Sequence, residues 1–100
     1  MFEILENKRG EYYFVLKARN GQTILTSGEY TTKASCENGI ESVKKNSRYD
    51  ERFERLYTKK GKPYFRLKAT NGQIIGESMF YESVAARENG IESVKRNAYE

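Results

Sequence analysis

Apolar and polar residues alternate near the start of the chain, as they do in strands that bury one face. Strand-like sequence at Phe2–Glu6 is followed by a turn at Lys8-Arg9-Gly10. The next stretch, EYYFVLKA, alternates more regularly and predicts a second strand. Its first face carries Phe14, Leu16 and Ala18, and its second face carries Tyr13, Val15 and Lys17.

A helical pattern follows a third strand-like stretch. Thr32 is a suitable N-cap, because its hydroxyl can accept a hydrogen bond from a first-turn amide. We expect this helix to end near Asn46, with Lys44 and Lys45 in the last turns, where cations complement the helix dipole. The pattern therefore predicts the order strand, strand, strand, helix.

This order of elements occurs twice. A shift of 51 positions aligns residues 2–47 with residues 53–98 without a gap, and 26 of the 46 paired positions are identical. Each unit is shorter than 50 residues and has no disulfide, so neither is expected to be stable alone. We predict a single domain over residues 1–100, in which repeat 1 (about 2–47) and repeat 2 (about 53–98) share one core.

The Asn20-Gly21 pair predicts a hairpin, because glycine reaches positive φ at no steric cost. A two-residue loop would place Leu16 opposite Leu25, which becomes a glycine in the second copy. A three-residue loop, with Gly21 in a bulge, would place Leu16 opposite Ile24, and this pair is apolar in both copies. We therefore favour the three-residue loop.

The octet ENGIESVK is present in both repeats, as residues 37–44 and 88–95. On a helical period, three residues of each copy face the sheet. These helix–sheet seam residues are Gly39, Ile40, Val43, Gly90, Ile91 and Val94. A glycine inside a helix costs about 1 kcal/mol relative to alanine, a cost that is explained if a side chain there would collide with the sheet.

The other octet residues, Glu37, Asn38, Glu41 and Ser42, face away from the seam. In one interpretation the glutamates form ion pairs with Lys44 or Lys45 on a solvated helix face. In the other, the polar positions form a surface that contacts a partner or the other repeat. The sequence is compatible with both.

Composition limits the class of protein. With 37% hydrophobic and 32% charged residues the chain is typical of a soluble globular protein, and its net charge of +4 allows a polyanionic partner without requiring one. No stretch approaches the roughly 20 apolar residues of a membrane span, and we identify no signal peptide. The single Cys36 fits a reducing compartment. We predict a cytoplasmic protein without a membrane partner.

Candidate catalytic chemistry is sparse. The chain has no histidine, which removes the commonest general base and most transition-metal sites. Cys36 corresponds to Arg87 of the second repeat, so the thiol is not part of the repeated design and is expected to be a buried bystander. No phosphate loop or dinucleotide motif occurs. We predict no enzymatic activity, no catalytic residue, no metal and no cofactor.

The second face of the sheet is the best candidate binding surface. It combines aromatic and cationic residues, a composition suited to stacking on bases and following phosphates in single-stranded nucleic acid. The candidate residues are Tyr13, Lys17, Tyr64, Arg66 and Lys68. The alternative is an ordinary solvated face, because tyrosine forms strands well and lysine protects sheets from aggregation.

Both repeats contain an F-x-L-K-A strand, an N-G-Q turn, a tyrosine before the helix and a G-I-x-S-V helix that ends in Asn. This combination resembles the YegP-like family of small, mainly bacterial proteins. The resemblance implies an α+β fold: two tandem β-β-β-α repeats forming one antiparallel sheet, with two helices packed on one face about a pseudo-twofold axis. It implies no established activity and no functional residues.

Some members of that family carry one unit and dimerise, so a tandem chain is expected to be a monomeric, covalent pseudo-dimer. Our functional hypothesis is a non-enzymatic binding module for an unknown protein partner. Single-stranded nucleic-acid binding through the aromatic and basic sheet face is the alternative.

Overall fold

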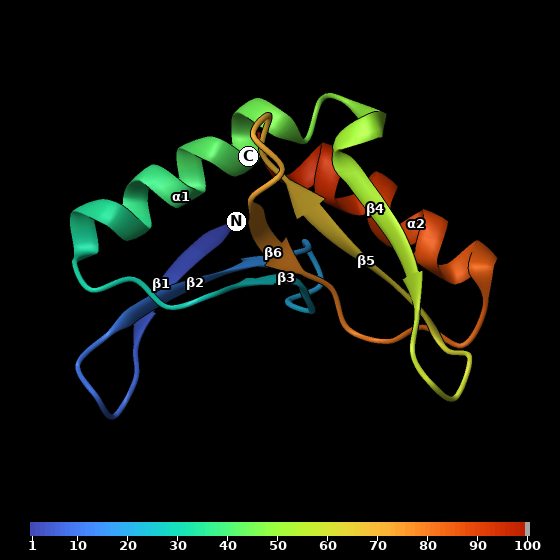
Figure 1. Cartoon of the computed structure of the whole chain (residues 1–100), viewed down its shortest axis with the longest axis horizontal. Helices are drawn as coiled ribbons and strands as arrows, with labels where there is room; N and C mark the ends of the chain where they lie inside the picture. Colours follow the sequence, from blue (N-terminus) through green and yellow to red (C-terminus); the bar gives the residue numbers. More distant parts are fainter. Residues whose placement is uncertain (100) are drawn as a thin grey trace.

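The computed structural model describes residues 1–99, which form two successive β-β-β-α units (Figure 1). The first repeat contains β1 (Phe2–Glu6), β2 (Tyr12–Lys17), β3 (Thr23–Ser27) and α1 (Lys33–Asn46). The second contains β4 (Phe53–Tyr57), β5 (Pro63–Lys68), β6 (Ile74–Glu77) and α2 (Val84–Asn97). A short 3₁₀ helix, η1 (Asp50–Arg52), connects them. The predicted order of elements is confirmed.

All six strands form one antiparallel sheet in the order β1-β2-β3-β6-β5-β4, and both helices cover the same face of it (Figure 1). The repeats join at the centre, where Thr26 of β3 pairs with Glu77 of β6. These two residues occupy equivalent positions, since 26 + 51 = 77. A pseudo-twofold axis therefore passes between them, and the predicted α+β fold is confirmed.

On the helical side of the molecule, the pseudo-twofold axis passes between the C-terminal ends of the two helices. There Arg48 Nε donates a hydrogen bond of 2.9 Å to Tyr99 Oη, and these residues are also equivalent, since 48 + 51 = 99. Tyr99 Oη in turn donates to the Lys44 carbonyl near the end of α1 at 2.6 Å. Equivalent residues thus contact each other on both faces of the protein.

One buried cluster of side chains fills the space between the sheet and the helices. Helix α1 packs on β2 of its own repeat and on β5 and β6 of the other, and α2 packs reciprocally on β5, β2 and β3. Fully buried members from both repeats include Phe14, Leu16, Val43, Phe65, Leu67 and Val94. Because each helix contacts both repeats, the core is continuous across the axis.

The helix–sheet seam lies where the octet predicts it. Gly39, Val43, Gly90, Ile91 and Val94 are buried, and Ile40 is partly buried against the same cluster.

Helix ends also agree with the sequence. Thr32 accepts a hydrogen bond from the Ser35 amide and Ser83 accepts one from the Ala86 amide, so both helices have the predicted N-cap.

The hairpin register differs from the prediction. The loop does have three residues, because the Ala18 amide donates to the Gln22 carbonyl, and Gly21 has a φ of 85°. However, Leu16 pairs with Leu25 and not with Ile24. A register shift between Leu16 and Lys17 accounts for the difference, because it inserts Ile24 as an extra residue and allows Ile24 and Leu25 both to be buried.

Candidate functional site

The residues of the predicted binding face lie together only in part. All five, Tyr13, Lys17, Tyr64, Arg66 and Lys68, are half-buried residues of β2 and β5. Strands β3 and β6 lie between β2 and β5. Three strand spacings therefore separate Tyr13 from Tyr64, about 14 Å. The two tyrosines do not form one continuous stacking platform.

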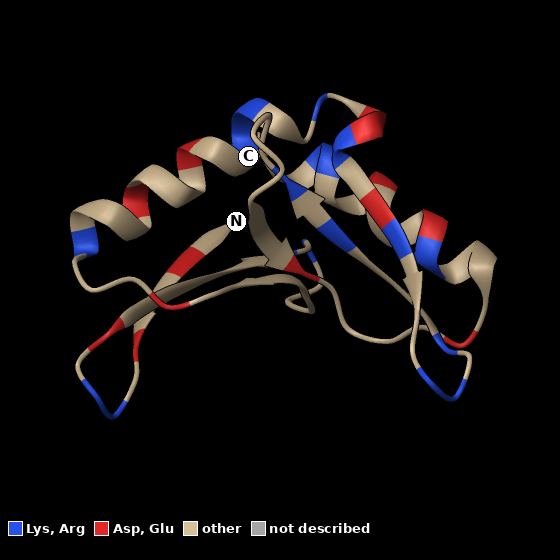
Figure 2. Cartoon of the chain, in the orientation of Figure 1, with Lys and Arg blue, Asp and Glu red and all other residues tan. Residues whose placement is uncertain are grey.

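Acidic residues neutralise the cations of this face. Lys17 Nζ lies 3.1 Å from Glu3, Arg66 Nε lies 2.8 Å from Glu77, and Lys68 Nζ lies 3.1 Å from Glu54. Figure 2 shows basic and acidic segments interspersed along the strands, with further cations at the tips of the β1–β2 and β4–β5 hairpins. Three cations balanced by three carboxylates do not make the positive track that a phosphate backbone requires.

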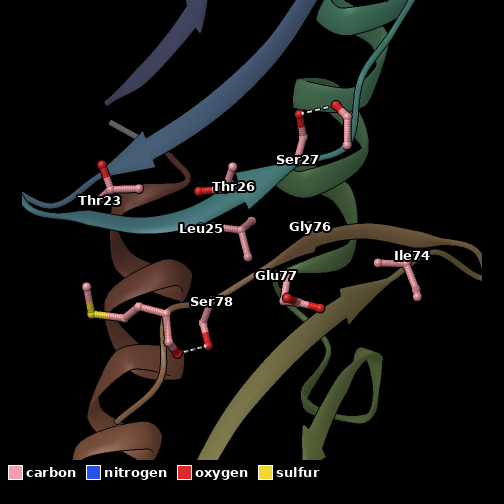
Figure 3. Close-up of a pocket in the computed structure, with 10 residues that line it drawn as sticks. Thr23, Leu25, Thr26, Ser27, Ile74, Gly76, Glu77 and Ser78 are labelled. Atoms are coloured by element: carbon pink, nitrogen blue, oxygen red, sulfur yellow. Dashed lines mark hydrogen bonds between the residues drawn. The ribbon is translucent and has the colours of Figure 1, made fainter. Parts of the chain in front are cut away.

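The sheet centre contains an open pocket of about 440 Å³ where β3 and β6 diverge (Figure 3). Leu25 extends from β3 to Gly76 of β6, which has no side chain. The two serine hydroxyls at the rim are occupied, because Ser27 donates to the Gly28 carbonyl and Ser78 to the Met79 carbonyl. The charged residue of the lining, Glu77, is already paired with Arg66. The lining of this pocket therefore offers no unpaired charged side chain to a ligand.

Two other clefts repeat the same design on the helix side. Each lies between the helix of one repeat and the Asn-Gly-Gln hairpin of the other. The α1 cleft is lined by Tyr30, Asn38, Gly39 and Ser42 of the first repeat and by Ala69, Gln73 and Ile75 of the second. The α2 cleft is lined by the equivalent residues Tyr81, Asn89, Gly90, Ser93, Ala18, Gln22 and Ile24. The pseudo-twofold axis therefore relates two candidate sites.

A tyrosine forms one wall of each cleft. The Tyr30 ring stacks on Phe14 with a centroid distance of 6.3 Å, and the Tyr81 ring stacks on Phe65 at 6.2 Å. Main-chain hydrogen bonds hold both tyrosines against the sheet: Tyr30 exchanges two with Tyr12, and the Tyr81 amide donates to the Pro63 carbonyl. The tyrosine before each helix is thus a fixed part of the sheet–helix junction.

The helix glycines make room for these tyrosines. A Cβ at Gly39 would lie 2.8 Å from Tyr30 Cζ and 2.9 Å from Phe14 Cε2. A Cβ at Gly90 would lie 2.6 Å from Tyr81 Cζ. The predicted collision is therefore confirmed, and its main partner is a tyrosine ring that lies between helix and sheet.

The clefts are small, polar and uncharged. Their volumes are about 220 and 200 Å³, below the roughly 300–1,000 Å³ of typical small-molecule sites. Burial raises the pKa of the Tyr30 and Tyr81 phenols, so both hydroxyls stay protonated and can donate hydrogen bonds. Within residues 1–99, the side-chain amides of Asn38 and Gln73 form no hydrogen bond with another protein group. These groups are available to a ligand.

The polar half of the octet has two different environments. Asn38 and Ser42 line the α1 cleft, so they do not simply face solvent. Glu41 is exposed and lies 3.5 Å from Lys44, as the ion-pair interpretation predicts.

The first glutamate of the octet behaves differently in the two repeats. Glu88 accepts two hydrogen bonds of 3.0 Å from Arg55 Nε on β4 and one of 3.1 Å from Arg87 Nε, its neighbour on α2. Glu37, its equivalent, is exposed.

Cys36 lies in the core. Burial, with a smaller contribution from Glu37, raises the pKa of its thiol, which therefore stays protonated and enclosed. No group of three or more metal-ligating side chains occurs among residues 1–99. Neither helix in this described part of the chain is long and apolar enough to cross a membrane.

The twin clefts were not predicted from the sequence. Their walls join residues of α1 with a hairpin about 30 positions further along the chain. The signal was nevertheless present, because the tyrosine, the Asn and Ser of the octet and the Gln of the hairpin are identical in both repeats.

The fold and its paired clefts define a tandem-repeat α+β protein with one site at each inter-repeat junction. The chain belongs to the family described as "Domain of unknown function (DUF1508)", whose sequence model matches residues 7–54 and again residues 59–100. The resemblance predicted from the sequence is thereby confirmed. The family description gives no activity.

Bacterial relatives match over nearly the whole chain. A UPF0339 protein of Acinetobacter baylyi is 60% identical over 96% of this chain and 86% of its own length. The UPF0339 protein YegP of Escherichia coli K12 is 52% identical, covering 96% and 87%. The solution structure of UPF0339 protein SO3888 from Shewanella oneidensis superposes with a TM-score of 0.93 at 49% identity, covering 99% of this chain and 84% of that one.

Proposed function

We propose that this chain is a non-enzymatic binding protein that holds short segments of a protein partner in the α1 and α2 clefts. The observation that carries the proposal is the equivalence of the two clefts: the same residue types, at equivalent positions, build both from opposite repeats. A packing role explains Gly39 and Gly90, and Ser42 and Ser93 accept hydrogen bonds from the asparagines at the ends of their helices. No contact among the described residues explains why Asn38 and Asn89 are identical.

The chemistry of the lining favours a peptide. A volume near 200 Å³ accommodates one or two side chains rather than a cofactor. Amide, hydroxyl and phenol groups donate and accept hydrogen bonds, so they can pair with the backbone amides of a peptide and with its Asn, Gln and Ser side chains. We assign no reaction to the clefts, because their tyrosines are held in the protonated form and no activated nucleophile lines them.

Peptide selection tests the proposal directly. A random heptapeptide library would be selected on the immobilised chain, and the enriched peptides would be titrated into ¹⁵N-labelled protein. We expect amide shifts at both clefts, with Asn38→Ala weakening binding at the α1 cleft and Asn89→Ala at the α2 cleft.

Glu41→Ala and Glu92→Ala are the matched controls, because they change exposed residues of the same helices outside the clefts. Failure to enrich any peptide would contradict the proposal, as would peptides that shift only residues of the opposite sheet face.

We also propose that the chain is a cytoplasmic monomer. The single Cys36 fits a reducing compartment. The central β3–β6 pairing, which would otherwise require a second subunit, is supplied within the chain.

Single-stranded nucleic-acid binding by Tyr13, Lys17, Tyr64, Arg66 and Lys68 is the weaker alternative, because glutamates pair with all three cations. It would require salt-sensitive binding of labelled single-stranded RNA or DNA that Tyr64→Ala and Lys68→Ala both weaken.

A further inference from the structure

The two clefts differ at the end that lies near the C-termini of the helices. The α2 cleft adjoins a second pocket of about 460 Å³, here called the basic pocket, and the two share Ala18, Asn20 and Ser93. Arg19, Arg96 and Asn97 complete the lining of the basic pocket. A ligand in the α2 cleft can therefore extend towards the Arg96 guanidinium.

The corresponding end of the α1 cleft is closed by a side chain of the protein itself. Arg52 Nη1 donates hydrogen bonds of 2.7 Å to Asn46 Oδ1 and to Thr70 Oγ1. Asn46 and Thr70 are the equivalents of Asn97 and Arg19. Arg52 therefore bridges helix and hairpin at the place where the α2 side has its basic pocket.

Nothing similar bridges the basic pocket among the described residues. Met1, the equivalent of Arg52, is 70% exposed and does not line it. Arg96 is exposed and forms no hydrogen bond or ion pair with any other residue of the range 1–99. The arrangement leaves at least this guanidinium directed to a ligand or to solvent.

One neutral side chain of the basic pocket, Asn20, is suited to an anion. Asn20 Oδ1 accepts a hydrogen bond from the Gln22 amide, which leaves the NH₂ group of Asn20 as a donor. Asn97 Nδ2 is bonded to the carbonyl and hydroxyl of Ser93, which fixes the asparagine on the helix. Guanidinium groups bind carboxylates through two parallel hydrogen bonds and do so better than lysine.

We infer that the α2 cleft and the basic pocket form one site for a peptide segment that presents a carboxylate next to a neutral amide, whereas the α1 cleft binds neutral segments only. This inference rests on the proposed function and specifies the partner of one of its two sites. The asymmetry lies in Arg96 and in the absence of an equivalent of Arg52 among the residues that line the basic pocket.

Two small probes separate the two sites. N-acetylglycinate carries an amide and a carboxylate, and N-acetylglycinamide carries amides only. In titrations of the ¹⁵N-labelled full chain, we expect the carboxylate probe to shift the amides of Ser93, Arg96 and Asn97. It should bind there at least about fivefold more tightly than the neutral probe.

The neutral probe should bind the two clefts with similar affinity. Arg96→Gln should abolish the preference for the carboxylate at the α2 cleft. Lys45→Gln changes the equivalent position beside the α1 cleft and is the matched control that should leave all affinities unchanged.

A transplanted site provides the converse test. The double variant Arg52→Ala/Lys45→Arg removes the bridging cation and places an arginine at the position equivalent to Arg96. We expect this variant to gain carboxylate-dependent shifts at Ser42, Asn46 and position 45, which the unmodified chain lacks.

Each contrary outcome has a distinct meaning. Equal affinity of the two probes at the α2 cleft overturns the inference and leaves the proposed function standing. Absence of shifts at both clefts with either probe overturns both. Inorganic phosphate that binds the same residues more tightly than N-acetylglycinate overturns the assignment to a carboxylate.

Discussion

Tyr30 and Tyr81 occupy equivalent positions and have nearly identical surroundings, each stacked on a phenylalanine and facing a helix glycine. Leu25 and Gly76 also occupy equivalent positions, yet one is a fully buried side chain and the other has none. The tyrosines contact residues of their own repeat. Leu25, in contrast, extends over Gly76 at the boundary between the repeats.

The difference shows which packing requirements are the same in both repeats and which are not. Contacts within a repeat are satisfied by the same residues twice, so identical sequence suffices. At the axis, a side chain meets the equivalent position of the other repeat, and two large residues would compete for one space. Leu25 with Gly76 and Arg48 with Tyr99 are therefore complementary pairs rather than copies.

The largest expected effect comes from Leu25. Leu25→Ala removes a fully buried side chain at the junction, and we expect a loss of about 3 kcal/mol in the free energy of unfolding. Gly76→Ala should cost about 1–2 kcal/mol, because its Cβ would lie 2.9 Å from Leu25 Cγ. Urea denaturation measures both.

The double variant Leu25→Ala/Gly76→Ala sharpens this result. With the leucine removed, the added methyl group has room, so the double variant should be more stable than the sum of the single effects predicts. Strict additivity would show that the two residues do not share one space.

The next largest loss of stability is expected at the equivalent glycines of the two helices, Gly39 and Gly90. Gly39→Ala places a Cβ 2.9 Å from Phe14 as well as against Tyr30, whereas the three atoms nearest to a Cβ at Gly90 all belong to Tyr81. Because Phe14 is fully buried and Tyr81 only partly, we expect Gly39→Ala to destabilise by about 2 kcal/mol and Gly90→Ala by less. Thermal or urea unfolding gives the order.

Glu41→Ala, at an exposed position of the same helix, should change stability by no more than about 0.5 kcal/mol. Equal losses for the two glycine variants would mean that the tyrosines alone decide the cost and that Phe14 adds nothing.

The smallest expected change in stability comes from Glu88→Gln, compared with the same substitution at the equivalent Glu37. Hydrogen bonds from Arg55 lower the pKa of Glu88. A lowered pKa stabilises the folded protein above the unfolded value of about 4, and this contribution is lost as the pH falls through the folded value. Because solvent screens the pair, Glu88→Gln should cost less than about 1 kcal/mol near pH 7.

The Glu88→Gln difference should shrink as the solution is made acidic and disappear once the native carboxylate is itself protonated. Glu37→Gln is the matched control and should have no effect at either pH, since Ile4 stands where the second repeat has Arg55. A deficit of Glu88→Gln that persists unchanged in acid would exclude the ion pair as its cause.

Sequence patterns predicted the parts of the fold that depend on neighbours in the chain. The caps at Thr32 and Ser83, the helix ends and the order of elements along the chain rest on local chemistry, and all are confirmed. The predicted strand register at Leu16 was wrong. The prediction required the residue opposite this position to be apolar in both repeats, and Leu25 corresponds to Gly76. At the axis these two residues satisfy opposite requirements.

The candidate sites show a similar limit. The face that carries Tyr13 and Tyr64 was predicted from alternation, but alternation does not show that Glu3, Glu54 and Glu77 lie beside its cations. The clefts combine a helix of one repeat with a hairpin of the other, and no single stretch of sequence contains both walls.

The Arg48–Tyr99 contact has a consequence for how such a protein can change. In a dimer of identical chains, every substitution on the symmetry axis occurs twice and meets its own copy, so an arginine there would face an arginine. Covalent duplication separates the two halves as targets of mutation. One half can acquire a tyrosine while the other keeps its arginine, and an interface that was self-complementary becomes selective for its own partner half.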